Sequence, residues 1–271
     1  MAEPAPDAPV DACEEAGVAV LPGAEPFHHE GGPVGVLLCH GFTGSPQSLR
    51  PWADRLVEAG HSVSLPLLPG HGTTWQDMNR SRWPEWYSTV DVALSQLRSR
   101  CDAVVVAGLS MGGALALRLA EQRGADVAGL VLVNPAVKVE DPRLKVLPLL
   151  RFLLPSLPAI GGDIKKPGAT ELAYERTPLQ ALHSMVAMYA AVAADLPSVR
   201  QPLLLFRSPE DHIVPASSSR LILDRVGSVD VTEVLCEDSY HVATLDNDAE
   251  RIFEGSLAFI DRLAKPATSP R

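Results

Sequence analysis

The chain has 271 residues, of which 46% are hydrophobic and 21% are charged, and its formal net charge is −10. This length and apolar content suit one large α/β domain with an insertion. The acidic balance and the lack of any basic cluster exclude a nucleic-acid-binding surface, and no stretch reaches the roughly 18 uninterrupted apolar residues of a membrane helix.

The N-terminal stretch is acidic and rich in proline, and it has neither the basic region nor the apolar segment of a signal peptide. We therefore expect residues 1–26 to form a disordered tail and the protein to be cytoplasmic. The four cysteines are scattered, with no CxxC pair, which fits a reducing compartment and predicts neither a disulfide framework nor a zinc site.

After the tail, short apolar runs alternate with helix-like segments. Strands are predicted at 35–39, 61–68, 103–108 and 127–136, and helices at 45–60, at 83–100 and directly after Ser110. In the helix at 45–60, Ser45 is the expected N-cap, Pro46 the first helical residue and Gly60 the C-cap. This alternation indicates a mainly parallel sheet covered by helices on both faces.

The alternation stops between residues 139 and 198, where leucine, proline and methionine are frequent and no β-like run is found. Strands are expected again at 202–208 and 229–235, followed by a helix at 248–265. We therefore expect a core of residues 27–138 and 199–265, with residues 139–198 inserted as a small cap of helices and loops.

Ser110 lies between a predicted buried strand and a predicted helix, in the stretch Gly108-Leu109-Ser110-Met111-Gly112. This G-x-S-x-G pattern predicts a nucleophile elbow, in which the flanking glycines allow the strand and the helix to approach closely. The alternative is an ordinary N-cap serine followed by small residues. An elbow would present the hydroxyl at a helix N-terminus, where a developing anion is stabilised.

A serine hydroxyl becomes a good nucleophile only when a base accepts its proton. In a parallel sheet with an elbow, the acid and then the histidine follow later strands, and Asp211 and His241 occupy these positions. Glu210 is the rival acid, but the Asp-x-x-V-P turn favours Asp211. We interpret the neighbouring His212 as structural.

The loop after the strand at 35–39 is expected to supply an oxyanion donor, so the backbone N–H groups of Phe42 and Met111 are the candidate pair. We interpret His40 and His71 as structural residues of the surrounding loops. His28 and His29 could suggest a metal site, but adjacent side chains on an extended chain point to opposite faces. No HExxH or other ligand spacing is present, so we expect no metal site.

Five motifs, HGFTGSP, LPGHG, AGLSMGG, SPEDHIVP and SYHVATLD, together resemble those of bacterial α/β-hydrolase carboxylesterases, and most closely bacterial monoacylglycerol lipases. The resemblance extends from about residue 27 to 265 and includes the segment AIGGDIKKPGATELAYERTP. It implies the α/β-hydrolase fold with a cap inserted after the sixth strand. It also implies a triad of Ser110, Asp211 and His241, an oxyanion hole from Phe42 and Met111, and no cofactor.

In those lipases the cap covers an acyl pocket and contacts the glycerol head group, and Ile160 and Glu171 match the contacting positions here. Simple cap packing is the alternative role for Ile160, and a solvated helix position is the alternative for Glu171. Methionines such as Met185 and Met188 could line the acyl pocket or pack the cap onto the core.

The resemblance implies hydrolysis of monoacylglycerol to fatty acid and glycerol through an acyl-enzyme on Ser110. A carboxylesterase for other short- or medium-chain esters is the first alternative, and a ligand-binding protein with little turnover is the second. The expected partner is a small lipid or ester substrate, with at most transient membrane contact through the cap. We infer no oligomeric state from the sequence.

Overall fold

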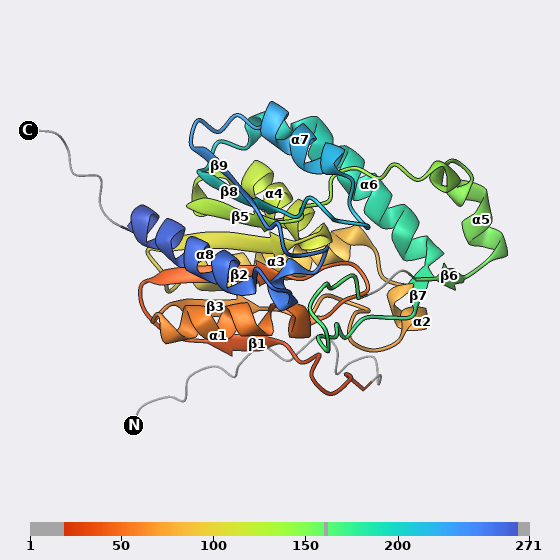
Figure 1. Cartoon of the computed structure of the whole chain (residues 1–271), viewed down its shortest axis with the longest axis horizontal. Coiled ribbons are helices and arrows are strands. Elements are labelled where there is room, and N and C mark those ends of the chain that lie inside the picture. Colours follow the sequence, from red (N-terminus) through yellow and green to blue (C-terminus); the bar gives the residue numbers. More distant parts are fainter. Residues whose placement is uncertain (1–18, 160–161, 265–271) are drawn as a thin grey trace, which may run out of the picture.

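The computed structural model of the chain describes residues 19–159 and 162–264. Its centre is a seven-stranded sheet in the order β1-β3-β2-β4-β5-β8-β9, in which every neighbouring pair is parallel except β1 with β3 (Figure 1). This confirms the expected mainly parallel sheet. The strands are β1 Phe27–His29, β2 Val34–Cys39, β3 Ser62–Leu65, β4 Ala103–Leu109, β5 Gly129–Val133, β8 Leu203–Arg207 and β9 Val231–Leu235.

The central strands are buried on both faces, which explains their continuous apolar sequences. In β4 every residue after Ala103 is buried, and β5 is buried along its whole length. The sequence analysis did not identify β1 as a strand. Its three residues pair antiparallel with β3, and they are too few and too exposed to show a two-residue period.

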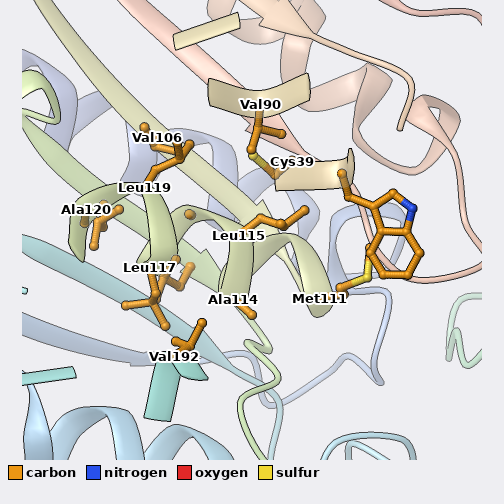
Figure 2. Packing of buried hydrophobic residues seen from close by; sticks show 14 of the residues in the cluster. Cys39, Val90, Val106, Met111, Ala114, Leu115, Leu117, Leu119, Ala120 and Val192 are labelled. Carbon is orange, nitrogen blue, oxygen red and sulfur yellow. The ribbon is translucent and has the colours of Figure 1, made fainter. Parts of the chain in front are cut away.

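Helices cover both faces of this sheet. On one face α1 (Arg50–Glu58) packs against α8 (Ala249–Ala264), and on the other α4 (Met111–Arg123) packs against α3 (Trp83–Arg98) and α6 (Leu179–Asp195). The remaining helices are α2 Trp75–Met78, α5 Leu147–Leu153 and α7 Ala216–Arg225. The helix that begins after Ser110 is buried almost throughout. Figure 2 shows side chains of α4 packed among residues such as Cys39, Val90 and Val192.

The helix expected at 45–60 is divided in two, so that prediction was wrong in detail. A 3₁₀ turn at Pro46–Leu49 precedes α1. Pro51 lacks the N–H group that a continuous α-helix would direct at the carbonyl of Gln47, so the helix cannot begin at residue 46. The Ser45 hydroxyl does not cap the turn, and instead donates a hydrogen bond to the carbonyl of Leu172 at 3.2 Å.

The insertion between β5 and β8 contains α5, α6 and two short strands, β6 (Ser156–Pro158) and β7 (Arg176–Pro178). These strands form a separate antiparallel ribbon, which corrects the expectation that residues 139–198 contain no strand. Three-residue strands that include prolines give no periodic signal. The ribbon is reinforced by Arg176, whose Nε donates to the Ser156 hydroxyl at 2.7 Å.

Helix α6 and the turn after it, Leu179–Ser198, are long and apolar enough to cross a membrane by length and composition. However, α6 packs against α4 and α5, and its side chains Met188 and Val192 are completely buried. The burial of α6 between the insertion and the core therefore explains its apolar composition.

Candidate active site

Ser110 lies at the sharp turn between β4 and α4, where φ is 56° and ψ is −117°. Residues other than glycine rarely adopt such a backbone conformation, so the surrounding hydrogen bonds must maintain it. The Ser110 N–H donates to the carbonyl of Val133 at the end of β5, and the Ser110 carbonyl accepts from the N–H groups of Gly113 and Ala136, each at 3.0 Å. The hydroxyl is thereby fixed at the carboxyl end of the sheet.

The two glycines of the elbow are required by close backbone packing. A Cβ atom on Gly108 would overlap the backbone of Gly112, and one on Gly112 would overlap the carbonyl of Cys39 at the end of β2. The strand, the helix and the neighbouring strand therefore meet at a point where no side chain fits. This is the close approach that the G-x-S-x-G pattern predicts.

Asp211 and His241 extend from the loops after β8 and β9 and lie beside each other. Nδ1 of His241 is 2.8 Å from Oδ2 of Asp211, and both side chains are buried. The other oxygen of Asp211, Oδ1, accepts the N–H groups of Ile213 and Val214, each at 2.8 Å. The rival acid Glu210 forms an ion pair with Lys165 at 3.1 Å instead.

The pKa of His241 is raised above its ordinary value of 6.5. Burial alone would lower this pKa, but the hydrogen bond to Asp211 and the negative charges of Asp211, Glu171 and Asp163 together outweigh the burial. An imidazole in this position can accept a proton from a hydroxyl group, and the resulting cation is stabilised by the carboxylates around it.

Asn134, at the end of β5, was not identified from the sequence although it supports this arrangement. Its φ is 44°, and its amide donates to the Ser208 hydroxyl and to the carbonyls of Tyr240 and His241, while its oxygen accepts the Ser208 N–H. It thus links the end of β8 to the loop that carries His241. The only local signal was the Asn-Pro pair directly after a buried strand.

His40 fixes the loop after β2. Its Nδ1 donates to the carbonyl of Gly41 at 3.1 Å, and its Nε2 accepts the N–H of Leu68 at 3.2 Å. Burial lowers the pKa of His40 to about 4, so the ring is neutral near pH 7. His71 is also buried, with its Nδ1 3.2 Å from the carbonyl of Pro69, and its ring packs edge-on against that of His40. Both histidines have the structural surroundings expected for them.

The loop that His40 fixes lies directly against the elbow. A Cβ atom on Gly41 would be only 3.5 Å from the Cβ of Ser110. Among residues 19–159 and 162–264, the N–H groups of Phe42 and Met111 donate no hydrogen bond. In the described part of the chain these two N–H groups are therefore unoccupied, which is what the donors of an oxyanion hole require.

One cavity of about 720 Å³ is lined by Ser110, Asp211, His241, Phe42 and Glu171. The insertion contributes an apolar wall to this cavity, made of residues Leu144, Leu147, Leu150, Leu157, Leu179, Leu182, Met185 and Tyr189. Burial raises the pKa of Glu171, although the charge of His241 and the backbone N–H of Gly162 oppose this effect. The site therefore combines a polar end, which includes a buried carboxyl group, with an apolar wall.

The structure describes most of the other residues singled out from the sequence. Ile160 is outside the described residues. Met185 and Met188 are both buried in the core, and Met185 also lines the cavity. His212 is exposed and binds Asp163, and Nδ1 of His28 is 3.1 Å from the Ser64 hydroxyl. In the described part of the chain, no three histidine, cysteine, aspartate or glutamate residues cluster as metal ligands would.

A model of the serine aminopeptidase family S33 matches residues 34–248, which include the elbow, the acid and the histidine. The chain belongs to this family. Its relatives include a thermostable monoacylglycerol lipase of Bacillus sp. strain H-257, with 44% identity over 90% of this chain and 97% of the relative. A carboxylesterase of Bacillus subtilis strain 168 is 24% identical over 88% of this chain and 97% of the relative.

Solved structures with the same fold are also similar to this chain. A structure from work on LipS and LipT, two metagenome-derived lipolytic enzymes, matches with a TM-score of 0.88 and 44% identity, covering 90% of this chain and 100% of that chain. The monoacylglycerol lipase of Paleococcus ferrophilus matches with a TM-score of 0.74 over 89% of this chain and 100% of that chain. Its identity is 18%, so this second match shows the shared fold alone.

Proposed function

We propose that this protein is a serine carboxylic ester hydrolase that cleaves monoacylglycerols into fatty acid and glycerol. The observation that carries this proposal is a single cavity in which Ser110 and the Asp211–His241 pair lie beside a buried carboxyl group and an apolar wall. The similarity to the Bacillus monoacylglycerol lipase, 44% identity over almost the whole of both chains, supports the same substrate class.

In the first half of the reaction, the Ser110 hydroxyl oxygen attacks the ester carbonyl carbon while His241 accepts the hydroxyl proton. The carbonyl oxygen becomes an anion, for which the free N–H groups of Phe42 and Met111 are the donors. The C–O bond to glycerol then breaks, and His241 transfers its proton to the departing oxygen. Asp211 keeps the ring oriented throughout and stabilises its cationic form.

In the second half, a water molecule attacks the acyl-enzyme on Ser110 while His241 accepts one of its protons. The tetrahedral intermediate collapses, the bond to the serine oxygen breaks, and His241 returns the proton to Ser110. The products are a fatty acid and the free enzyme. Every proton is carried by the substrate, by water or by the side chains described above, so the reaction needs no added cofactor.

Glu171 is the residue we propose to bind the glycerol head group. It lines the cavity, and a carboxyl group can hydrogen-bond two neighbouring hydroxyls at once. Its pKa is raised by burial despite the backbone N–H of Gly162, and a buried carboxyl group gains from further hydrogen bonds to a polar ligand. We propose the same subsite for Ile160, by its position in the sequence, as an apolar contact.

The outer surface of α5 is the region that we propose to meet lipid. Leu149, Phe152 and Leu153 are 73%, 70% and 78% exposed, while Leu147 and Leu150 of the same helix line the cavity. An apolar surface next to the cavity favours transient contact with an aggregate of amphipathic substrate. This contact would deliver the acyl chain to the cavity without anchoring the protein.

The test is a comparison of substrates under matched conditions. Wild type and Ser110→Ala are assayed on 1-monolauroylglycerol, dilauroylglycerol, trilauroylglycerol and p-nitrophenyl butyrate. We expect rapid hydrolysis of the monoacylglycerol, little hydrolysis of the di- and triacylglycerols, and loss of all activity in the variant. Turnover of the butyrate ester alone would identify a general carboxylesterase. Equal inactivity of both proteins, with no fluorophosphonate labelling, would favour a ligand-binding protein.

A further inference from the structure

A short segment of the insertion, residues 162–166, lies across the loops that carry Asp211 and His241. Asp163 makes four polar contacts to these loops. Oδ2 of Asp163 accepts the backbone N–H groups of His241 and His212, each at 3.2 Å. Oδ1 is 2.8 Å from Nδ1 of His212, and the Asp163 carbonyl accepts the N–H of Val242 at 3.1 Å.

These contacts give His241 two separate supports. Asp211 holds the imidazole ring through Nδ1, whereas Asp163 holds the backbone of the same residue through its N–H. The carboxylate of Asp163 is only 13% exposed, so its hydrogen bonds are largely protected from competing water. Because it also holds His212, next to Asp211, a single residue of the insertion fixes two catalytic loops relative to each other.

We propose that Asp163 is a positioning residue for ester hydrolysis, whose carboxylate aligns the His241 and Asp211 loops and thereby makes the triad depend on docking of this segment of the cap. The inference rests on the proposed serine hydrolase mechanism, but not on the monoacylglycerol as substrate. A misplacement of reacting groups by about 1 Å can lower a rate by about 100-fold, so the alignment of the two loops has a direct kinetic effect.

The negative charge of Asp163 has a second effect, on the pKa of His241. The carboxylates that influence His241 are Asp211, Glu171 and Asp163, and the groups that face His212 are Asp163, Asp211, Glu210 and the ring of Tyr240. The negative charge of Asp163 raises the pKa of His241, so it also stabilises the cationic ring that forms during the reaction. Loss of this charge is expected to move the acid limb of activity to lower pH.

The same segment offers a matched control. Lys165 also links the cap to both loops, through its Nζ atom at 3.1 Å from Glu210 and 3.2 Å from Asp238. Both carboxylates are more than half exposed, and ion pairs of this kind contribute little. Lys165→Met therefore removes side-chain contacts between the cap and the loops without touching His241, His212 or Asp163.

The experiment compares Asp163→Ala, Asp163→Asn and Lys165→Met with the wild type. Values of kcat and KM are measured on 1-monolauroylglycerol and p-nitrophenyl butyrate between pH 5 and 9, and folding is checked by circular dichroism and Tm. For Asp163→Ala we expect kcat to fall by about 10- to 100-fold on both esters with little change in KM. We expect Asp163→Asn to recover part of this loss, because its oxygen still accepts a backbone N–H, and to shift the acid limb to lower pH.

Lys165→Met is expected to stay within about twofold of the wild type. The proposal is overturned if Asp163→Ala retains wild-type kcat, or if Lys165→Met loses as much activity as Asp163→Ala. If Asp163→Ala does not fold, Asp163→Asn decides, since an unchanged kcat and acid limb in that variant also overturns the proposal. Failure of the monoacylglycerol assignment would leave the loss on p-nitrophenyl butyrate intact, so the two failures are distinguishable.

Discussion

Oδ2 of Asp211 lies 2.8 Å from Nδ1 of His241, and this contact follows from the turn in which Asp211 is placed. The other carboxylate oxygen is occupied by two backbone N–H groups of the same turn, from Ile213 and Val214. The turn itself therefore orients the Asp211 carboxylate, independently of its contact with His241. Glu210, one residue earlier, lies outside this turn and pairs with Lys165 at the surface.

The first prediction concerns these two neighbouring acids. We expect Asp211→Asn to lower kcat by about 10³- to 10⁴-fold, because an amide favours the wrong tautomer of His241 and does not stabilise its cation. Glu210→Gln changes an adjacent carboxylate in the same way but loses only a surface ion pair, so kcat should stay within about twofold. The measurement is steady-state hydrolysis of p-nitrophenyl butyrate. A large loss of kcat in Glu210→Gln would instead identify Glu210 as the acid.

The second prediction concerns the elbow. We expect Gly112→Ala to lower the free energy of unfolding by about 1–3 kcal/mol, because the new methyl group must displace the carbonyl end of β2. The same displacement moves the loop that carries Phe42, so fluorophosphonate labelling of Ser110 should slow down. Urea denaturation and labelling rates measure the two effects. Wild-type values for both would show that the backbone at this point is not tightly packed.

The core of the fold and the candidate triad could be predicted because their signals are local. Buried parallel strands have continuous apolar sequences, and the elbow requires glycines at fixed distances from Ser110. The Asp-x-x-V-P turn similarly indicated Asp211 rather than Glu210. In each case the physical cause lies within a few residues of the pattern that reports it.

The features that sequence analysis missed depend on contacts between distant residues. β6 and β7 are 20 residues apart in the chain and too short for a periodic pattern. Asn134 and Asp163 bind loops that lie about 50 to 107 residues further along the chain, largely through backbone N–H and carbonyl groups that any sequence would supply. Nothing near either residue in the sequence identifies its partners.

The third prediction separates substrate binding from chemistry at Glu171. We expect Glu171→Gln to raise KM for 1-monolauroylglycerol by about 10-fold through a weakened hydrogen bond to glycerol, while KM for p-nitrophenyl butyrate is unchanged. The negative charge of Glu171 raises the pKa of His241, so the acid limb of kcat/KM should also move to lower pH in the variant.

Glu140→Gln is the matched control for this variant. Glu140 also lines the cavity, but its carboxylate is paired with Lys138 at 2.7 Å and with the Ser217 hydroxyl at 2.8 Å. We expect its KM for the monoacylglycerol to remain within about twofold of the wild type. An equal rise in both variants, or a rise for the butyrate ester as well, would argue against head-group binding by Glu171.

The fourth prediction concerns stability and its dependence on pH. The side chain of Glu121 is fully buried; its Oε2 is 2.9 Å from Arg118, whereas Oε1 has no hydrogen-bond partner in the part of the chain that the structure describes. Burial raises the pKa of Glu121 from 4.5 to about 7. The folded state therefore binds more protons than the unfolded state between these two pH values, and the free energy of unfolding falls as pH rises through this range.

Glu121→Gln removes this titration while preserving the shape of the side chain. In the wild type, the cost of ionising this buried carboxyl group develops as pH rises from 4.5 to about 7, and the variant does not have this cost. The free energy of unfolding of the variant, relative to wild type, should therefore be more favourable at pH 8 than at pH 4.5. Urea denaturation at the two pH values measures this difference. An unchanged or opposite difference would mean that Glu121 remains ionised in the folded protein throughout the range.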